Sequence, residues 1–140
     1  MGYWGVKSYE NDDAADALDA GFGQVHGASY DALMEDSNPT AFDDVQRQLA
    51  DPDTLAASLE ALRQAVGPDR PLDDWDDHDR LAFAGIVVRH AEFGVPVPVE
   101  WLNQALDWLR DEPIEWDEAT VRRLSRQREI ALLESRKASP

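Results

Sequence analysis

Apolar residues recur along this chain at the three- and four-residue intervals of helices that face a common core. The clearest run has intervals of four, three and four residues, at Leu55, Leu59, Leu62 and Val66. Asp51-Pro52 precedes this run and Gly67-Pro68 follows it, and such residues are typical of the start and the end of a helix. The pattern therefore predicts a helix over residues 52–66.

Cap and turn signals predict further helices on both sides of this one. Asn11 or Asp12 can cap a first helix that reaches about Asp19. Three glycines are then expected to loosen the chain: Gly21, Gly23 and Gly27. The remaining segments with helical spacing before the C-terminal region cover about residues 30–35, 39–50 and 101–109.

Eight consecutive nonpolar residues, from Leu81 to Val88, form the most apolar segment of the chain. Such a run fits either a helix that is buried on all sides or a buried strand. A helix over about residues 77–93 is favoured, because acids gather at its expected start and Gly94 follows its expected end. The part from Leu81 to Phe93 is then expected to lie at the centre of the core.

The C-terminal region predicts one more helix, which follows Asp117 as N-cap and reaches about residue 136. Trp116 before that cap and Val121 after it have the spacing of a hydrophobic staple. Its buried stripe is expected at Val121, Leu124, Ala131 and Leu132. Four arginines are then left to solvent or to acids on neighbouring helices: Arg122, Arg123, Arg126 and Arg136.

The length of 140 residues, of which 43% are hydrophobic, is enough for one domain with a sizeable core. Residues 67–77 contain two prolines and a run of acids, and they are expected to link the two halves of this domain. Trp4 and Tyr9 can anchor the glycine-containing N-terminal segment on the core. The predicted fold is an all-α, compact bundle of six or seven short helices over residues 1–140, with an extended, anchored N-terminal segment.

Several functional classes are excluded by composition. The chain has no cysteine, so it cannot form disulfides, bind zinc or iron–sulfur clusters through thiolates, or use a thiol nucleophile. No segment approaches the roughly 20 apolar residues of a membrane-spanning helix. The N-terminus lacks the basic and apolar regions of a signal peptide. A cytoplasmic location is therefore expected.

Negative charge is the strongest compositional signal, with 29 acidic and 13 basic residues giving a formal net charge of −16. Residues 1–120 contain 27 acids and 7 bases, whereas residues 121–140 contain 2 acids and 6 bases. The acidic part over residues 1–120 should repel nucleic acid, because proteins bind its phosphate backbone through Lys and Arg. We therefore expect a protein–protein interaction module of an immunity-like, antitoxin-like or regulatory kind that binds a basic protein. The candidate contact residues are Asp12, Asp13, Asp16, Asp73, Asp74, Asp76 and Asp77.

Two alternatives stay open at this point. A divalent-metal-dependent hydrolase or metal-binding protein could use a run of possible ligands: Asp74, Asp76, Asp77, His78 and Asp79. That run lacks the central glycine and the final glutamate of an EF-hand, and the other histidines, His26 and His90, stand far from it in sequence. The other alternative is a nucleic-acid mimic. No nucleophile motif or cofactor fingerprint is present, so neither catalysis nor a cofactor is predicted.

The first residues also resemble the start of a known family. The relevant positions are Met1, Gly2, Trp4, Gly5, Tyr9, Asn11, Asp12, Asp13, Ala14 and Asp16. Over roughly the first twenty residues the chain is similar to a small bacterial domain-of-unknown-function family, number 4259, in which an aromatic stands at the position of Tyr9. Lys7-Ser8 departs from the Gly-Pro of that family. The resemblance implies a bacterial cytosolic protein and supplies no activity.

Overall fold

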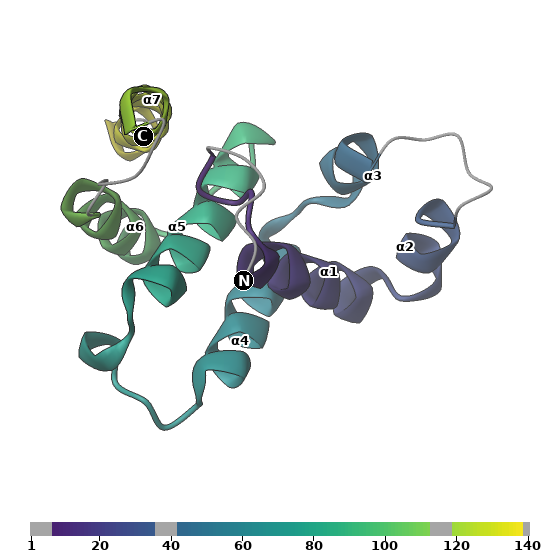
Figure 1. The fold of residues 1–140 in the computed structure, drawn as a ribbon. Helices are drawn as coiled ribbons and strands as arrows, with labels where there is room; N and C mark the ends of the chain where they lie inside the picture. Colours follow the sequence, from purple (N-terminus) through teal and green to yellow (C-terminus); the bar gives the residue numbers. More distant parts are fainter. Residues whose placement is uncertain (1–6, 36–41, 113–118, 139–140) are drawn as a thin grey trace.

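The fold was analysed in a computed structural model, which describes residues 7–35, 42–112 and 119–138. Trp4 and the predicted cap Asp117 lie outside these described residues. The described helices are α1 (Asp12–His26), α2 (Ala28–Leu33), α3 (Phe42–Leu49), α4 (Pro52–Val66), the short 3-10 helix η1 (Leu72–Asp74), α5 (Asp77–Glu92), α6 (Val99–Asp111) and α7 (Ala119–Ala138). The described part of the chain contains no strand, so the prediction of a compact all-α fold is confirmed (Figure 1).

Helix α5 forms the centre of the bundle. Every residue from Leu81 to Ala91 is buried, and α1, α4, α6 and α7 all pack against it (Figure 1). The helix begins where Asp76 accepts a hydrogen bond from the backbone N–H of Asp79 at 2.9 Å, and acids lie near its positive end. The helical prediction for this apolar segment is therefore confirmed, and the strand alternative is wrong.

Local capping explains the starts of α1 and α4. Asn11 accepts a hydrogen bond from the backbone of Ala14 at 2.9 Å. Asp51 and Thr54 exchange side-chain and backbone bonds of 2.8 and 2.9 Å, which makes a capping box. Helix α4 has the predicted bounds, because its cap, its proline and its apolar spacing all act within a few residues.

Helix α1 is longer than predicted, since it continues through Gly21 and Gly23 and ends only at Gly27, which has a positive φ of 53°. The reason is tertiary. A Cβ atom added at Gly21 would lie 2.2 Å from the Ser58 hydroxyl and 2.5 Å from its backbone nitrogen. The glycine therefore lets α1 and α4 cross at close range and does not loosen the chain.

The predicted buried stripe of α7 is wrong at Val121, Leu124 and Ala131, which are exposed, whereas Leu132 is half-buried and packs against the core. Val121 and Leu124 are 51% and 53% exposed, whereas Arg126, Glu129 and Leu133 are buried. The buried residues share one face at intervals of three and four. On this face Arg126 and Glu129 have polar partners in Glu112 and the N-terminal segment, and Leu133 belongs to the hydrophobic core.

The predicted linker contributes to the core. Trp75 is 3% exposed, and its ring stacks on that of Trp108 at 5.8 Å and meets Phe83 edge-on at 6.3 Å. The buried apolar residues before and after this segment belong to one cluster. No helix in the described ranges is long and apolar enough to cross a membrane.

Candidate functional site

The N-terminal segment lies directly on α5. A Cβ atom added at Gly85 would be 2.5 Å from the carbonyl oxygen of Ser8 and 2.8 Å from the Cα of Tyr9, so only glycine allows the two backbones to approach this closely. Ser8 donates to the Glu129 carboxylate from its backbone N–H at 3.0 Å and from its hydroxyl at 2.6 Å. Asn11 also donates to the Ser8 carbonyl at 2.7 Å. These contacts hold Lys7 and Tyr9 beside the core.

A buried ionic cluster supports this segment from α7. Arg126 pairs with Glu112 and, at 3.0 Å, with Glu129. Burial raises the pKa of Glu129, against the opposing effects of Arg126 and of the two bonds from Ser8. The cluster therefore joins α6, α7 and the N-terminal segment through groups that would be costly to leave unpaired.

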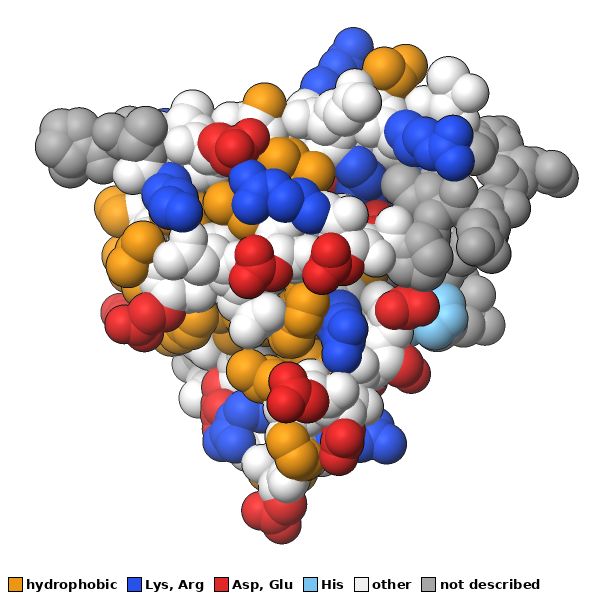
Figure 2. Space-filling view, turned by 90° about the vertical axis from the view of Figure 1, so that its left-hand side faces the viewer, with side chains coloured by type: hydrophobic (Ala, Val, Ile, Leu, Met, Phe, Trp, Pro, Cys, Tyr) orange, Lys and Arg blue, Asp and Glu red, His pale blue; other side chains and the backbone are white. Residues whose placement is uncertain are grey.

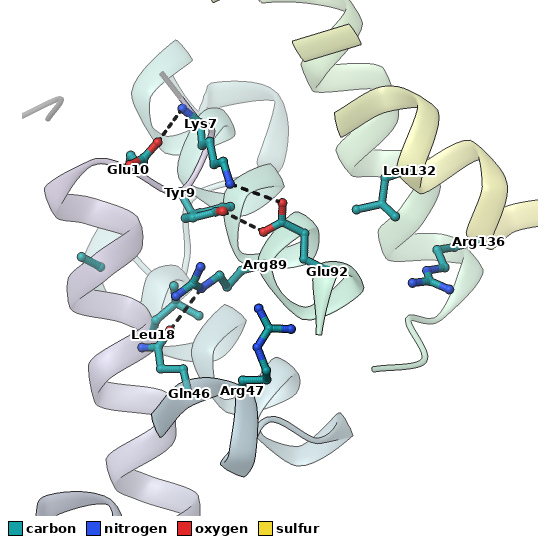
Figure 3. A pocket seen from close by; sticks show the side chains of 11 residues that line it. Lys7, Tyr9, Glu10, Leu18, Gln46, Arg47, Arg89, Glu92, Leu132 and Arg136 are labelled. Atoms are coloured by element: carbon teal, nitrogen blue, oxygen red, sulfur yellow. Dashed lines mark hydrogen bonds and ion pairs between the residues drawn. The ribbon is translucent and has the colours of Figure 1, made fainter. Parts of the chain in front are cut away.

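A cavity of about 650 Å³ opens between the N-terminal segment, α1, α3, α5 and α7 (Figure 3). Its described lining includes two carboxylates, Glu10 and Glu92. It also includes four basic side chains from four different elements: Lys7, Arg47, Arg89 and Arg136. We call this feature the basic cavity. Its excess of positive groups is opposite to the charge of the protein as a whole.

Aromatic rings and backbone groups position the arginines of the basic cavity. Arg89 is 6% exposed, and its guanidinium lies 4.7 Å from the ring centre of Tyr9 and 4.6 Å from that of Phe93. Arg47 lies over the same Phe93 ring at 5.0 Å. Arg136 donates to the carbonyl of Ala91 at 3.1 Å. The three guanidinium groups thus surround the C-terminal end of α5.

The carboxylates of the basic cavity are engaged on its N-terminal side. Tyr9 donates its hydroxyl to Glu92 at 2.7 Å, and Lys7 lies 3.9 Å from the other oxygen of Glu92. Burial raises the pKa of the Tyr9 hydroxyl, so it remains a donor at neutral pH. Glu10 accepts the backbone N–H of Lys7 at 3.1 Å.

The acids predicted to bind a partner are only partly brought together. Asp13 and Asp16 of α1 and Asp79 of α5 line one groove of about 260 Å³, whose other lining residues come from α1 and α4. Burial, followed by the nearby carboxylates of Asp76 and Asp13, raises the pKa of Asp79. We call this feature the acidic groove. The other candidates are exposed and do not line it: Asp12, Asp73, Asp74, Asp76 and Asp77.

The candidate metal ligands do not converge. Within the described ranges, no three His, Asp or Glu side chains are placed so that they could hold a metal ion. Asp74 ends η1, Asp76 caps α5, and Asp77, His78 and Asp79 form the first turn of α5.

The histidines lie apart as well. His78 and His90 are near opposite ends of α5, about 18 Å apart along the helix axis. His90 is buried, with its ring nitrogens 2.9 Å from the Thr54 hydroxyl and 2.9 Å from the Ile86 carbonyl. His26 lies 2.7 Å from the Leu49 carbonyl and 3.4 Å from Asp51. His26 and His90 therefore bind backbone and cap groups.

The sequence pattern did not single out the basic cavity. One local signal was Arg89, a charged residue that directly follows the apolar run ending at Val88. The other basic residues gave no such signal, because they are far apart in the chain and meet only after α3, α5 and α7 have packed.

Comparison with known proteins identifies no relative. No protein-family model matches the chain, and no curated protein and no solved structure matches it significantly. The similarity of the first twenty residues to the bacterial family described above therefore remains a prediction.

Proposed function

We propose that this protein binds a basic segment of a partner protein in the acidic groove. The observation that carries the proposal is that Asp13 and Asp16, from one acidic segment of the sequence, lie around the same groove as Asp79, from another. These segments are more than sixty residues apart in the chain, and the packing of α1, α4 and α5 joins them.

The charges of the acidic groove support this proposal. Asp13, Asp16 and Asp79 form no ion pair with a Lys or Arg in the described part of the chain. The raised pKa of Asp79 reflects in part the repulsion between neighbouring carboxylates. Lys or Arg side chains of a partner would relieve that repulsion and guide its approach.

The floor of the acidic groove supports a partner with an apolar side as well. Small and aliphatic residues of α1 and α4 line it: Ala17, Ala20, Ala61, Leu62, Ala65 and Val66. An amphipathic helix with basic residues beside an apolar stripe would match both the floor and the acidic rim.

Another face of the molecule has a mixed charge pattern. Figure 2 shows the side of the molecule that carries α6 and α7, where basic and acidic side chains are interspersed. Such a mixed surface offers no strong attraction to a cationic partner. The proposal therefore concerns the groove between α1 and α4 only.

The test uses a synthetic amphipathic peptide of Lys and Leu with a fluorescent label, whose binding is followed by fluorescence anisotropy. Binding is expected at low salt and should weaken strongly at about 0.5 M salt, because screening shortens the range of the attraction. Replacing Asp13, Asp16 and Asp79 together by Asn should abolish it. The matched control replaces three exposed acids outside the groove: Asp31, Asp69 and Asp107.

A further variant separates the groove from general charge attraction. Ala20 is exposed on the groove floor, so Ala20→Lys places both bulk and positive charge there. We expect this variant to lose peptide binding while it keeps its melting temperature. Two results would show that the peptide binds the overall negative charge and not this groove. One is equal weakening of peptide binding by the triple substitution in the groove and by the triple substitution outside it, and the other is unchanged binding by Ala20→Lys.

The two other functions considered from the sequence gain no specific support. A metal-dependent hydrolase needs converging ligands, and the described residues do not supply them. A nucleic-acid mimic needs a row of carboxylates spaced like phosphates, whereas the three acids of the groove surround a concave apolar floor.

A further inference from the structure

We infer that the basic cavity is a binding site for a small phosphate monoester that also carries hydroxyl groups, such as a sugar phosphate. This site is separate from the acidic groove. The starting observation is that four of the few basic residues of an acidic protein line one cavity of about 650 Å³. A surface with this excess of acids would instead be expected to pair its bases singly with neighbouring carboxylates.

Two of these bases have no acidic counterpart among the residues that the structure describes. Arg47 and Arg136 form no ion pair with a carboxylate in the part of the chain that the structure describes, although both line the cavity. By contrast, the exposed Arg63 and Arg110 each pair with a glutamate, at 2.8 and 2.9 Å. The cavity therefore keeps two positive groups available for an anion.

The third arginine is held in a fixed position. Arg89 is buried between the rings of Tyr9 and Phe93, and its Nε lies 3.4 Å from the Gln46 side-chain oxygen. A ligand would therefore bind with little further ordering of this side chain, which lowers the entropic cost of association. Its fixed positive charge in the cavity wall also favours an anion at this site.

The rest of the lining favours hydroxyl groups on the ligand. Figure 3 shows the Glu92 carboxylate turned toward Lys7 and Tyr9, with Glu10 beside Lys7. Their carboxylates can accept hydrogen bonds from ligand hydroxyls, whereas they would repel a second phosphate. The volume is within the range of about 300–1,000 Å³ that is typical of small-molecule sites. These features together favour a singly phosphorylated, hydroxyl-bearing molecule over a polyanion.

The test is isothermal titration calorimetry of the full chain with ribose 5-phosphate at constant ionic strength. Ribose, sodium sulfate and ribonate serve as comparison ligands. We expect saturable one-to-one binding of ribose 5-phosphate and weaker or absent binding of the others. NMR should show shifts of the Nε–H signals of Arg47 and Arg136 on titration. Ribose tests the need for the anion, sulfate the need for the sugar, and ribonate distinguishes carboxylate from phosphate.

Exposed arginines provide matched variants. Arg47→Gln and Arg136→Gln should each weaken binding about tenfold, as expected for the loss of one charge-assisted contact, and the double variant should abolish it. Arg63→Gln and Arg110→Gln remove the same charge elsewhere and should leave the affinity unchanged. All four side chains are exposed, so the variants should fold normally.

The inference would be overturned by three results. One is the absence of saturable binding of ribose 5-phosphate by the folded wild-type protein. Another is equal weakening by the cavity and control variants, which would indicate only general electrostatic attraction. The third is tighter binding of ribonate or sulfate than of ribose 5-phosphate, which would assign the cavity to a different class of anion.

Discussion

Replacing Gly85 by alanine should detach the N-terminal segment from the core. Alanine is favoured over glycine inside a helix by about 1 kcal/mol, so local propensity alone predicts a more stable protein. The added Cβ, however, would lie 2.5 Å from the carbonyl oxygen of Ser8 and 2.8 Å from the Cα of Tyr9. Both atoms belong to backbone, which cannot rotate away as a side chain can.

The loss in the free energy of unfolding follows from the hydrogen bonds that the displaced segment weakens. To restore ordinary contact, Ser8 must move by about 1 Å from α5, a shift that disrupts its two bonds to Glu129 and the bond from Asn11. Hydrogen bonds to a charged group each contribute about 1.5–3 kcal/mol, and overpacking of a core adds about 1–3 kcal/mol. If the weakening of these three bonds together equals the loss of one of them, and the propensity gain of about 1 kcal/mol is subtracted, we expect the free energy of unfolding to fall by about 1.5–5 kcal/mol.

The measurement is urea unfolding and thermal melting followed by circular dichroism, and the melting temperature should fall by about 3 °C per kcal/mol. Gly23→Ala is the matched control, because Gly23 also lies inside a helix but its added Cβ would meet only a Tyr30 ring carbon at 4.0 Å. That control should gain about 0.5–1 kcal/mol. A Gly85→Ala protein as stable as this control would mean that the segment does not lie against α5.

Three other substitutions test the packing and the buried polar groups. Gly21→Ala should lower the free energy of unfolding by about 2 kcal/mol or more in urea melts, because the added Cβ would lie 2.5 Å from the backbone nitrogen of Ser58. A gain in stability would contradict the close crossing of α1 and α4. Glu129→Ala should lower the free energy of unfolding by about 3–5 kcal/mol in the same assay, because it leaves Arg126 buried with fewer partners. A loss below 1 kcal/mol would show that the buried ionic cluster of Arg126, Glu112 and Glu129 is open to water. Burial lowers the pKa of His90 from 6.5 to about 4, so the folded state resists a proton that the unfolded chain accepts. The stability that the neutral imidazole contributes is complete above pH 6.5 and is lost as the pH falls toward 4, by about 3 kcal/mol in all. His90→Gln should lack this loss, and parallel pH profiles of the two proteins would contradict a buried neutral imidazole.

The helices were the most predictable part of this protein. The bounds of α4 follow from Asp51, Pro52 and the spacing of its leucines, all of which act within a few residues. The position of α5 follows from an apolar run that must be surrounded on all sides. These signals are local or depend only on burial, so they can be read without knowledge of the neighbouring helices.

Errors arose where a neighbouring element overrides a local signal. Gly21 was expected to loosen the chain, yet it lies inside α1, where the missing Cβ lets Ser58 of α4 approach closely. The apolar spacing of α7 placed Val121 and Leu124 in the core, yet the helix turns Arg126 and Glu129 inward. In both cases the deciding contact is with a residue distant in the chain.

The two candidate sites also depend on contacts between residues that are distant in the chain. Acid-rich segments suggested a cation-binding surface, but only the packing of α1, α4 and α5 selects Asp13, Asp16 and Asp79 from the many acids. The basic cavity had no linear signature beyond Arg89, because its bases come from the N-terminal segment, α3, α5 and α7. The chain by itself specifies its helices and its core, since these depend on short-range spacing and on hydrophobicity. Which charged groups meet depends on how the helices and the N-terminal segment pack, and close contacts such as those at Gly21 and Gly85 decide this packing.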